Sequence, residues 1–380
     1  MVDQHDRPKP GRDGFEVAII CAIPFEASAV EFVIDEFWDM DGDAIKKAPG
    51  DQNQYRTGRI GDYNVVTTLL PEPGNPSAAA AIKQVVSYFP QVRLALVVGT
   101  CGAVPTVSES DEEIILGDVI ISTSMVEVDY GTDVTDIFQK SKEPVCGALP
   151  EAAGDITSLL RSFETRLNRQ RLHDHVSNHL VELQQADQHL CSRTLMPPLY
   201  RYRGASKDKL FAPTHIHRHR PDSAQSALTC ACSGGFVCAG ARRASCEKLR
   251  CGSGVDQIMR RRLALKKKAE KLETHTEAEL QAPAVHFGAV ASGDTNMRSA
   301  FHRNRLAHEH DIIAFEMEGA GPEISCLVIK GVSNYADGHR QARGWRDWGA
   351  ATAAAACKAI LVLRTRPEKQ GELTPPPPGF

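Results

Sequence analysis

The sequence predicts an α/β fold, in which buried strands alternate with helices. Short apolar runs recur along residues 15–145 and again along 283–365, and stretches with helical spacing separate them. Continuous apolar runs are typical of strands covered on both faces, as in parallel sheets. Strands interleaved with helices therefore indicate a mixed sheet with a central parallel portion.

The expected elements follow in a regular order along the chain. The first part has apolar strands at 15–23, 63–70, 92–104 and 117–123. Helical stretches follow the first two of these strands, as "EASAVEFVIDEF" and as "PSAAAAIKQVVSYF" (76–89). After residue 282 the pattern returns with "AVHFGAVASGD", "IIAFEMEGAG", "CLVIKGVSNYAD" and the alanine-rich helix "WGAATAAAACKAILVLRT".

Between these two parts the composition and the pattern of apolar residues change. Residues 146–282 hold an amphipathic stretch, a loop-like region rich in histidine, cysteine and arginine, and a basic run. Residues 1–14 are polar and 366–380 are rich in proline, so both are expected to be tails. The sequence thus predicts one α/β domain over 15–365, interrupted by an insertion at about 146–282.

Composition and charge exclude several classes of protein. Charged residues make up 24% of the chain and the formal net charge is −4, which gives no overall bias towards nucleic acid. No apolar run reaches the 18 residues of a membrane span, and the first residues show no signal peptide. Several of the 11 cysteines lie in apolar contexts typical of reduced thiols, so a cytoplasmic protein is expected.

Polar residues gather where three of the expected strands end. "VVGTCGAV" places Thr100 and Cys101 between two glycines, a turn whose amides can face an anion or hydroxyl groups. In "AFEMEGAG", Glu316 and Glu318 flank Met317, so one of the two carboxylates points towards a buried environment. A helix start stabilised by acidic residues would also explain this pair.

The third of these strands ends in "CLVIKGVSNYADGH" (326–339). Ser333, Asn334, Asp337 and His339 follow the apolar run closely. The carboxyl end of a parallel strand is where α/β enzymes usually hold their chemistry. Asn334 is the unusual member, because an amide can donate a hydrogen bond but cannot release a proton.

Six motifs, taken in order, resemble the purine nucleoside and uridine phosphorylase superfamily, which includes the methylthioadenosine/adenosylhomocysteine nucleosidases. They are "AII.A...E", "VVGTCGAV", "GDVIIS", "ASGD", "EMEGAG" and "S-N-YAD", spread over about 15–130 and 284–362. The strongest resemblance is to nucleoside phosphorylase-like domains of fungal proteins. It implies a three-layer α/β/α sandwich around a mixed sheet, a purine nucleoside as substrate, and a homodimer or higher homo-oligomer.

The same resemblance implies roles for individual residues. Glu26 matches the glutamate that positions and deprotonates water in the nucleosidases. Asn334 stands where the family has the aspartate that protonates purine N7. The residues implied to bind substrate are Thr100, Cys101, Gly102, Met297, Glu316, Met317, Glu318 and Ser333, of which Glu318 matches the glutamate on the ribose hydroxyls.

Water is the expected acceptor in this reaction. Family phosphorylases hold phosphate with two arginines, but here the first region reads "CAIPFEASA" and the second position is Val97. Charge-assisted pairs provide most of the affinity for phosphate, and Glu26 would repel it. Two alternatives stay open: a phosphorylase whose cations come from the insertion or a neighbouring subunit, and a weakly catalytic nucleoside-binding module.

Asn334 has two interpretations. Loss of the general acid would cost about 10²–10⁴ in rate and leave a slow enzyme. Alternatively, the amide N–H donates to N7 or O6 of a 6-oxopurine without proton transfer. The surrounding "YADGH" resembles the aspartate-bearing branch of the superfamily, which favours the slowed site.

The insertion raises the question of a metal. Its candidate ligands are His215, His217, His219, Cys230, Cys232, Cys238, Cys246 and Cys251. Their spacings match no standard pairing of zinc ligands, so we expect free thiols, no metal and no cofactor. The basic run from Arg260 to Lys268 is expected to be a solvated helix face, so neither nucleic acid nor membrane is an expected partner.

Overall fold

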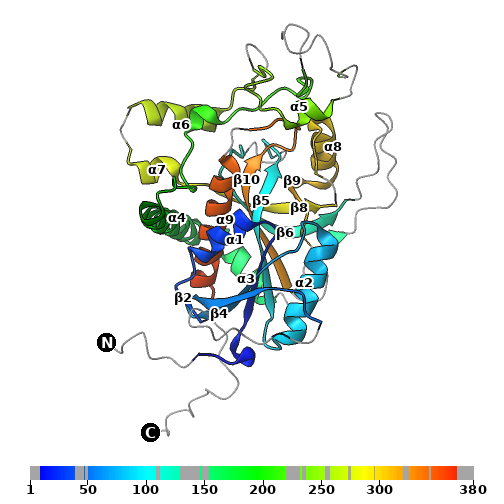
Figure 1. The fold of residues 1–380 in the computed structure, drawn as a ribbon. Coiled ribbons are helices and arrows are strands. Elements are labelled where there is room, and N and C mark those ends of the chain that lie inside the picture. The colour runs from blue at the N-terminus through cyan, green and yellow to red at the C-terminus, as the bar shows by residue number, and fades with distance from the viewer. Residues whose placement is uncertain are drawn as a thin grey trace.

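The structure is a mixed β-sheet with helices on both sides (Figure 1), which confirms the predicted α/β fold. It is a computed structural model. It describes residues 9–38, 47, 50–107, 112–128, 146–147, 154–219, 232, 237–252, 257–272, 275–294, 296–319, 325–341 and 344–365. Most of the two predicted tails, and several stretches of the predicted insertion, lie outside these residues.

The sheet runs in the order β10-β6-β8-β9-β5-β1-β4-β3-β2, and β7 pairs with β6. The strands are β1 (Val17–Cys21), β2 (Glu36–Phe37), β3 (Tyr55–Ile60), β4 (Tyr63–Leu69), β5 (Leu94–Ala103), β6 (Val119–Glu127), β7 (Cys146–Gly147), β8 (Val285–Ser292), β9 (Ile312–Glu316) and β10 (Ser325–Asn334). Strand β1 lies between β4 and β5, parallel to both, and all five of its residues are buried. This burial explains its uninterrupted apolar sequence.

Strand β5 closes part of the sheet on itself. It pairs with β10 in parallel along nearly its whole length, and its last residues pair with β9. Strands β9, β8, β6 and β10 continue the pairing, so that five strands form a ring. The ring brings the carboxyl ends of β5, β9 and β10 together, although these strands lie far apart in the sequence.

Helices cover the sheet on both sides (Figure 1). Helices α1 (Pro24–Glu31) and α9 (Trp345–Leu363) contact the sheet and each other, and α4 (Arg166–Thr194) packs on α9. Helices α2 (Asn75–Tyr88) and α8 (Ala300–His310) lie on the other side, and α3 (Gly154–Ser162) follows β7. Helix α9 approaches β10 closely at Gly331. A Cβ added to this glycine would lie 1.9 Å from the carbonyl oxygen of Gly349.

The end of the predicted insertion crosses the edge of the sheet where β5 and β10 end (Figure 1). Its short helices are α5 (Ala239–Arg243), α6 (Arg261–Leu272) and α7 (Glu277–Gln281). Arg260 is buried and pairs with Asp208 and with the hydroxyl of Tyr335, the residue after β10. The expectation of a solvated face is therefore wrong for Arg260, which anchors the insertion to the sheet.

Among the described residues, no helix combines the length and apolar character needed to cross a bilayer.

Candidate functional site

The site lies at the carboxyl ends of β1, β5, β9 and β10. Helix α1 starts directly after β1 with Pro24 in its first turn, which fixes the backbone where Glu26 leaves the sheet. The parallel pairing of β5 with β1 and β10 brings Thr100 and Lys330 to the same edge. The last residue of β9 is Glu316, and the turn after β9 supplies Glu318.

Glu26 is 2% exposed and is held by β5. Its Oε1 accepts hydrogen bonds from the amide and the hydroxyl of Thr100, both at 2.8 Å. A Cβ at Gly99 would lie 2.7 Å from the carboxylate, so only glycine permits this approach. Oε2 is buried and has no hydrogen-bond partner within the described part of the chain. Glu26 thus presents one unused acceptor inside the protein.

Lys330 is a site residue that the motifs did not reveal. It is 1% exposed on β10, and its Nζ lies 2.8 Å from Glu318 Oε2 and 3.4 Å from Glu316 Oε2. Burial alone would lower the pKa of Lys330, but the carboxylates of Glu318, Glu316 and Glu26 outweigh burial and raise it. The available signal was the lysine itself, inside the apolar run "CLVIKGV", because lysine is rarely buried unless it is paired.

The two glutamates of "EMEG" differ in what they contact. Glu316 accepts from the amides of Glu318 and Gly319, both at 2.8 Å, so its carboxylate fastens the turn after β9. Glu318 is hydrogen-bonded, within the described residues, through Oε2 to Lys330. Of the two carboxylates, Glu318 therefore has the greater capacity to accept from a ligand.

Burial shifts the acidity of these carboxyl groups. Burial raises the pKa of Glu26, against the opposing effects of Lys330 and Thr100. Burial also raises the pKa of Glu316, again opposed by Lys330. Lys330 is thus the cation that opposes the effect of burial on the carboxyl groups of Glu26 and Glu316.

Ser333 and Asn334 form a short hydrogen-bonded chain at the end of β10. Asn334 Nδ2 donates to Ser333 Oγ at 3.1 Å, and Ser333 Oγ donates to the carbonyl oxygen of Cys101 at 3.2 Å. Asn334 Oδ1 accepts from the amide of Ala336, a residue with a φ of +51°. The asparagine therefore holds a tight turn, and one N–H of its amide is left for a ligand.

A small cleft opens beside this turn. It is lined by Gly102, Asn296, Met297, Phe315, Glu316, Met317, Asn334 and Ala336. Glu316 joins the cleft to the buried cluster, since it borders the cleft and lies 3.4 Å from Lys330.

Eight of the ten predicted site residues therefore fall into two adjoining groups, and the other two support the turn beside them. Gly102, Met297, Glu316, Met317 and Asn334 line the cleft. Glu26 and Thr100 are hydrogen-bonded to each other. Glu318 belongs to the same group, because it contacts Lys330, whose charge also acts on Glu26. Cys101 and Ser333 are buried between β5 and β10, where they support the turn.

Comparison with known proteins adds a family match. Residues 16–177 match the phosphorylase superfamily, which confirms the resemblance seen in the motifs. A nucleotide-binding leucine-rich repeat (NLR)-like protein of Hyaloscypha variabilis is 25% identical over 365 residues. The match covers 94% of this chain but 30% of that relative, so the chain spans less than a third of the relative's length.

Two solved structures are similar over most of the chain. One is 5′-methylthioadenosine/S-adenosylhomocysteine nucleosidase from Neisseria meningitidis, with 13% identity, a TM-score of 0.44, and 91% of this chain and 98% of that chain covered. The other is futalosine hydrolase of Helicobacter pylori, with 12% identity, a TM-score of 0.45, and 92% and 97% covered.

Proposed function

Because residues 16–177 match the phosphorylase superfamily, we propose that the protein cleaves the N-glycosidic bond of a purine nucleoside, with water as the acceptor. One observation carries the choice of water: Glu26 Oε2 is a buried acceptor without a partner among the described residues, beside Thr100 and in the field of Lys330. Such an acceptor is suited to hold and deprotonate a water molecule.

In the reaction, the oxygen of this water attacks C1′ of the ribose and gives its proton to Glu26. The bond between C1′ and the base nitrogen breaks, and the base leaves with the bonding electron pair. Two hydrogen bonds from Thr100 fix one oxygen of Glu26, so that Oε2 is oriented before the substrate arrives.

Glu318 binds the ribose in this proposal. Its Oε2 lies 2.8 Å from Nζ of Lys330, and its carboxylate oxygens can accept from the 2′- and 3′-hydroxyls. The sugar becomes oxocarbenium-like in the transition state, so a carboxylate beside it is stabilising. Glu316, already bonded to two amides, positions Glu318.

The base occupies the cleft beside Asn334 in this proposal. Met297, Phe315 and Met317 offer apolar surface to a purine ring, and the second N–H of the Asn334 amide can donate to an acceptor on the edge of the base. An amide supplies no proton to the leaving base, so the proposed enzyme is slow. This observation also favours the second candidate, a module that binds nucleosides with little turnover.

Phosphate is the less suitable acceptor. Lys330 is the cation of the buried cluster in the described structure, and two carboxylates already contact it. A phosphate dianion would have to displace one of them and lie against Glu26. Phosphorolysis would therefore require cations from elsewhere, such as a neighbouring subunit.

Incubation with inosine, guanosine, adenosine and methylthioadenosine, with and without phosphate, tests the proposal. We expect free base and unphosphorylated sugar in both conditions. Sugar 1-phosphate formed only when phosphate is present would establish a phosphorylase instead. Calorimetric binding without any released base would establish the binding module. A cytoplasmic location and assembly into homo-oligomers remain predictions from the sequence.

A further inference from the structure

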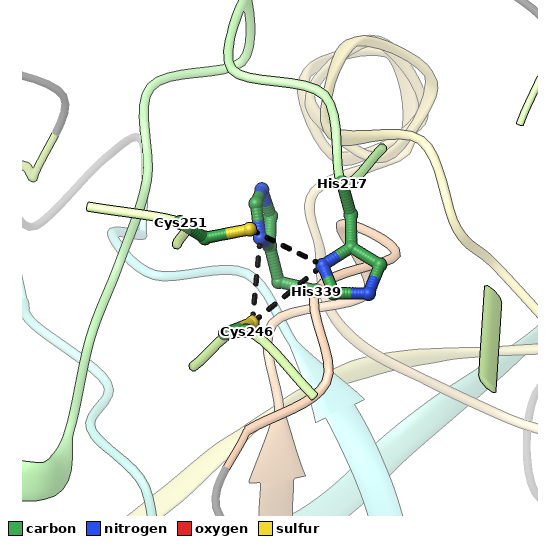
Figure 2. A group of neighbouring side chains, drawn as sticks. All are labelled: His217, Cys246, Cys251 and His339. Atoms are coloured by element: carbon green, nitrogen blue, oxygen red, sulfur yellow. Dashed lines mark hydrogen bonds between the residues drawn. The ribbon is translucent and has the colours of Figure 1, made fainter. Parts of the chain in front are cut away.

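A second group of reactive side chains lies outside the candidate catalytic cluster. His217, Cys246 and Cys251 come from the predicted insertion, and His339 comes from the loop after β10 (Figure 2). One nitrogen or sulfur atom of each residue lies within 4.8 Å of those of the other three. Cys246 is half-buried, and the other three are buried. These four atoms converge on a common centre.

The separations agree with one particular geometry. The sulfur of Cys246 lies 3.6 Å from Nδ1 of His217 and 3.6 Å from Nδ1 of His339, and the sulfur of Cys251 lies 3.5 Å from Nδ1 of His217. In a tetrahedral zinc site, Zn–S bonds of about 2.3 Å and Zn–N bonds of about 2.0–2.1 Å place sulfur and nitrogen about 3.6 Å apart.

Both imidazoles are oriented by their second nitrogen. Nε2 of His339 lies 2.7 Å from the carbonyl oxygen of His215, and Nε2 of His217 lies 3.0 Å from that of Ala244. A carbonyl oxygen can only accept, so each ring carries its proton on Nε2 and turns the lone pair of Nδ1 to the centre. This is the arrangement by which proteins orient histidine ligands of metals.

Hydrogen bonds between thiols and imidazoles explain the group less well. Two thiols have two protons, whereas Nδ1 of His217 faces both sulfurs and the sulfur of Cys246 faces both imidazoles. One lone pair cannot accept well from two donors at once. A central cation, in contrast, uses every one of the four converging atoms.

We propose that His217, Cys246, Cys251 and His339 bind a zinc ion. Two thiolates and two imidazoles are a donor set typical of zinc, and four protein ligands leave no open position for a substrate. The site is therefore structural. The spacing within the insertion could not reveal it, because His339 belongs to another part of the chain, and the expectation of free thiols is replaced by this proposal for Cys246 and Cys251.

The ion would fasten the insertion to the loop that follows Asn334. Asp337 accepts from the amide of His339 at 2.9 Å, and the ring of Phe211 stacks on His339 with centroids 4.1 Å apart. His339 is thus one of the points where the insertion meets the loop after β10. A second group, His219, Cys232 and Cys238, offers three ligand atoms within the described residues.

Metal analysis of the full chain tests the proposal. The protein is purified without chelators, dialysed against metal-free buffer, and analysed for zinc per chain by mass spectrometry. We expect at least one equivalent, with one equivalent lost on changing both Cys246 and Cys251 to serine. The matched control is Cys357→Ala, which changes a buried cysteine of α9 that is not a member of the group and should retain all of the zinc. His339→Gln should lose the same equivalent, and the neighbouring His215→Gln should retain it.

Unmodified protein provides the second measurement, should the variants fail to fold. Replacement of zinc by Co²⁺ should give the ligand-field bands of a tetrahedral centre and a thiolate charge-transfer band. Substoichiometric zinc that does not rise after incubation with zinc chloride would overturn the proposal. So would folded variants that keep as much zinc as the unmodified chain.

Discussion

At the scale of single residues, the candidate site gathers several carboxyl groups and one lysine inside the protein. Glu26, Glu316 and Glu318 are all buried, and Lys330 is the cation that opposes their desolvation. The cation is itself held by the carboxylates. The charges are therefore interdependent, and substitutions of single members should have large effects.

Glu26→Gln tests the assignment of the base. The amide preserves shape and can still accept from Thr100, but it cannot take a proton from water. We expect the rate of base release to fall by about 10²–10⁴, with substrate affinity changed little. Glu31→Gln, on the same helix, is the control and should behave as the unmodified protein. Normal hydrolysis by Glu26→Gln would show that water is activated elsewhere.

The pH profile of hydrolysis follows from the same residue. Glu26 acts as a base when ionised, and burial raises its pKa above that of a free glutamate. Activity should therefore be present above this raised pKa and be lost as the pH falls through it. The measurement is kcat/KM for inosine against pH, which should show an acid limb that lies above the ordinary range of a glutamate. A flat profile through that region would argue against a carboxylate base.

Lys330→Met tests the charge balance. The change removes the cation and leaves three carboxylates in a buried site, so the free energy of unfolding should fall by about 3–5 kcal/mol. Lys358→Met is the matched control, because Lys358 pairs with the partly exposed Asp35 and should contribute at most about 1 kcal/mol. Urea unfolding at neutral pH measures both. Equal losses of unfolding free energy in the two variants would contradict the proposal that Lys330 balances the buried carboxylates.

Asn334→Asp distinguishes the two interpretations of the asparagine. If the amide has replaced a general acid, the aspartate should raise turnover by about 10²–10⁴ on inosine and adenosine alike. We expect this outcome. Asn296→Asp, which adds a charge to the same cleft, should not raise turnover. A selective increase in turnover of adenosine relative to inosine would instead show that the amide recognises a 6-oxopurine by a hydrogen bond.

At the scale of secondary structure, the sequence predicts the helices and strands whose pattern is set by residues adjacent in the chain. The strand expected at 92–104 is β5 (Leu94–Ala103), and the helix expected at 76–89 is α2 (Asn75–Tyr88). Both were predictable because burial imposes a pattern on adjacent positions. Contacts between distant segments impose no such pattern. The pairing of Lys330 with Glu318, and of His339 with the insertion, therefore became visible only in the structure.

At the scale of the whole molecule, the predicted insertion is packed against the sheet. Asp208 accepts from the hydroxyl of Tyr335 at 2.8 and 2.9 Å, and Arg260 pairs with both. Arg262 pairs with the buried Asp118, which lies next to β6. These contacts and the proposed zinc join the insertion to the loop after β10 and to the edge of the sheet, so we expect the two parts to unfold together.

Two probes on the same sample test this cooperativity. Trp345 and Trp348 are buried in α9 and report on the sheet by fluorescence, and zinc captured by a chromogenic chelator reports on the insertion. Both signals should change at one urea midpoint, as expected of a single cooperative unit. Arg260→Gln should lower the two midpoints equally, because it breaks a buried pair between the parts, whereas Arg261→Gln, at an exposed neighbour, should leave them unchanged. If zinc left at a lower urea concentration than the fluorescence change in the unmodified chain, the insertion would be an independent unit and Arg260 would not couple it to the sheet.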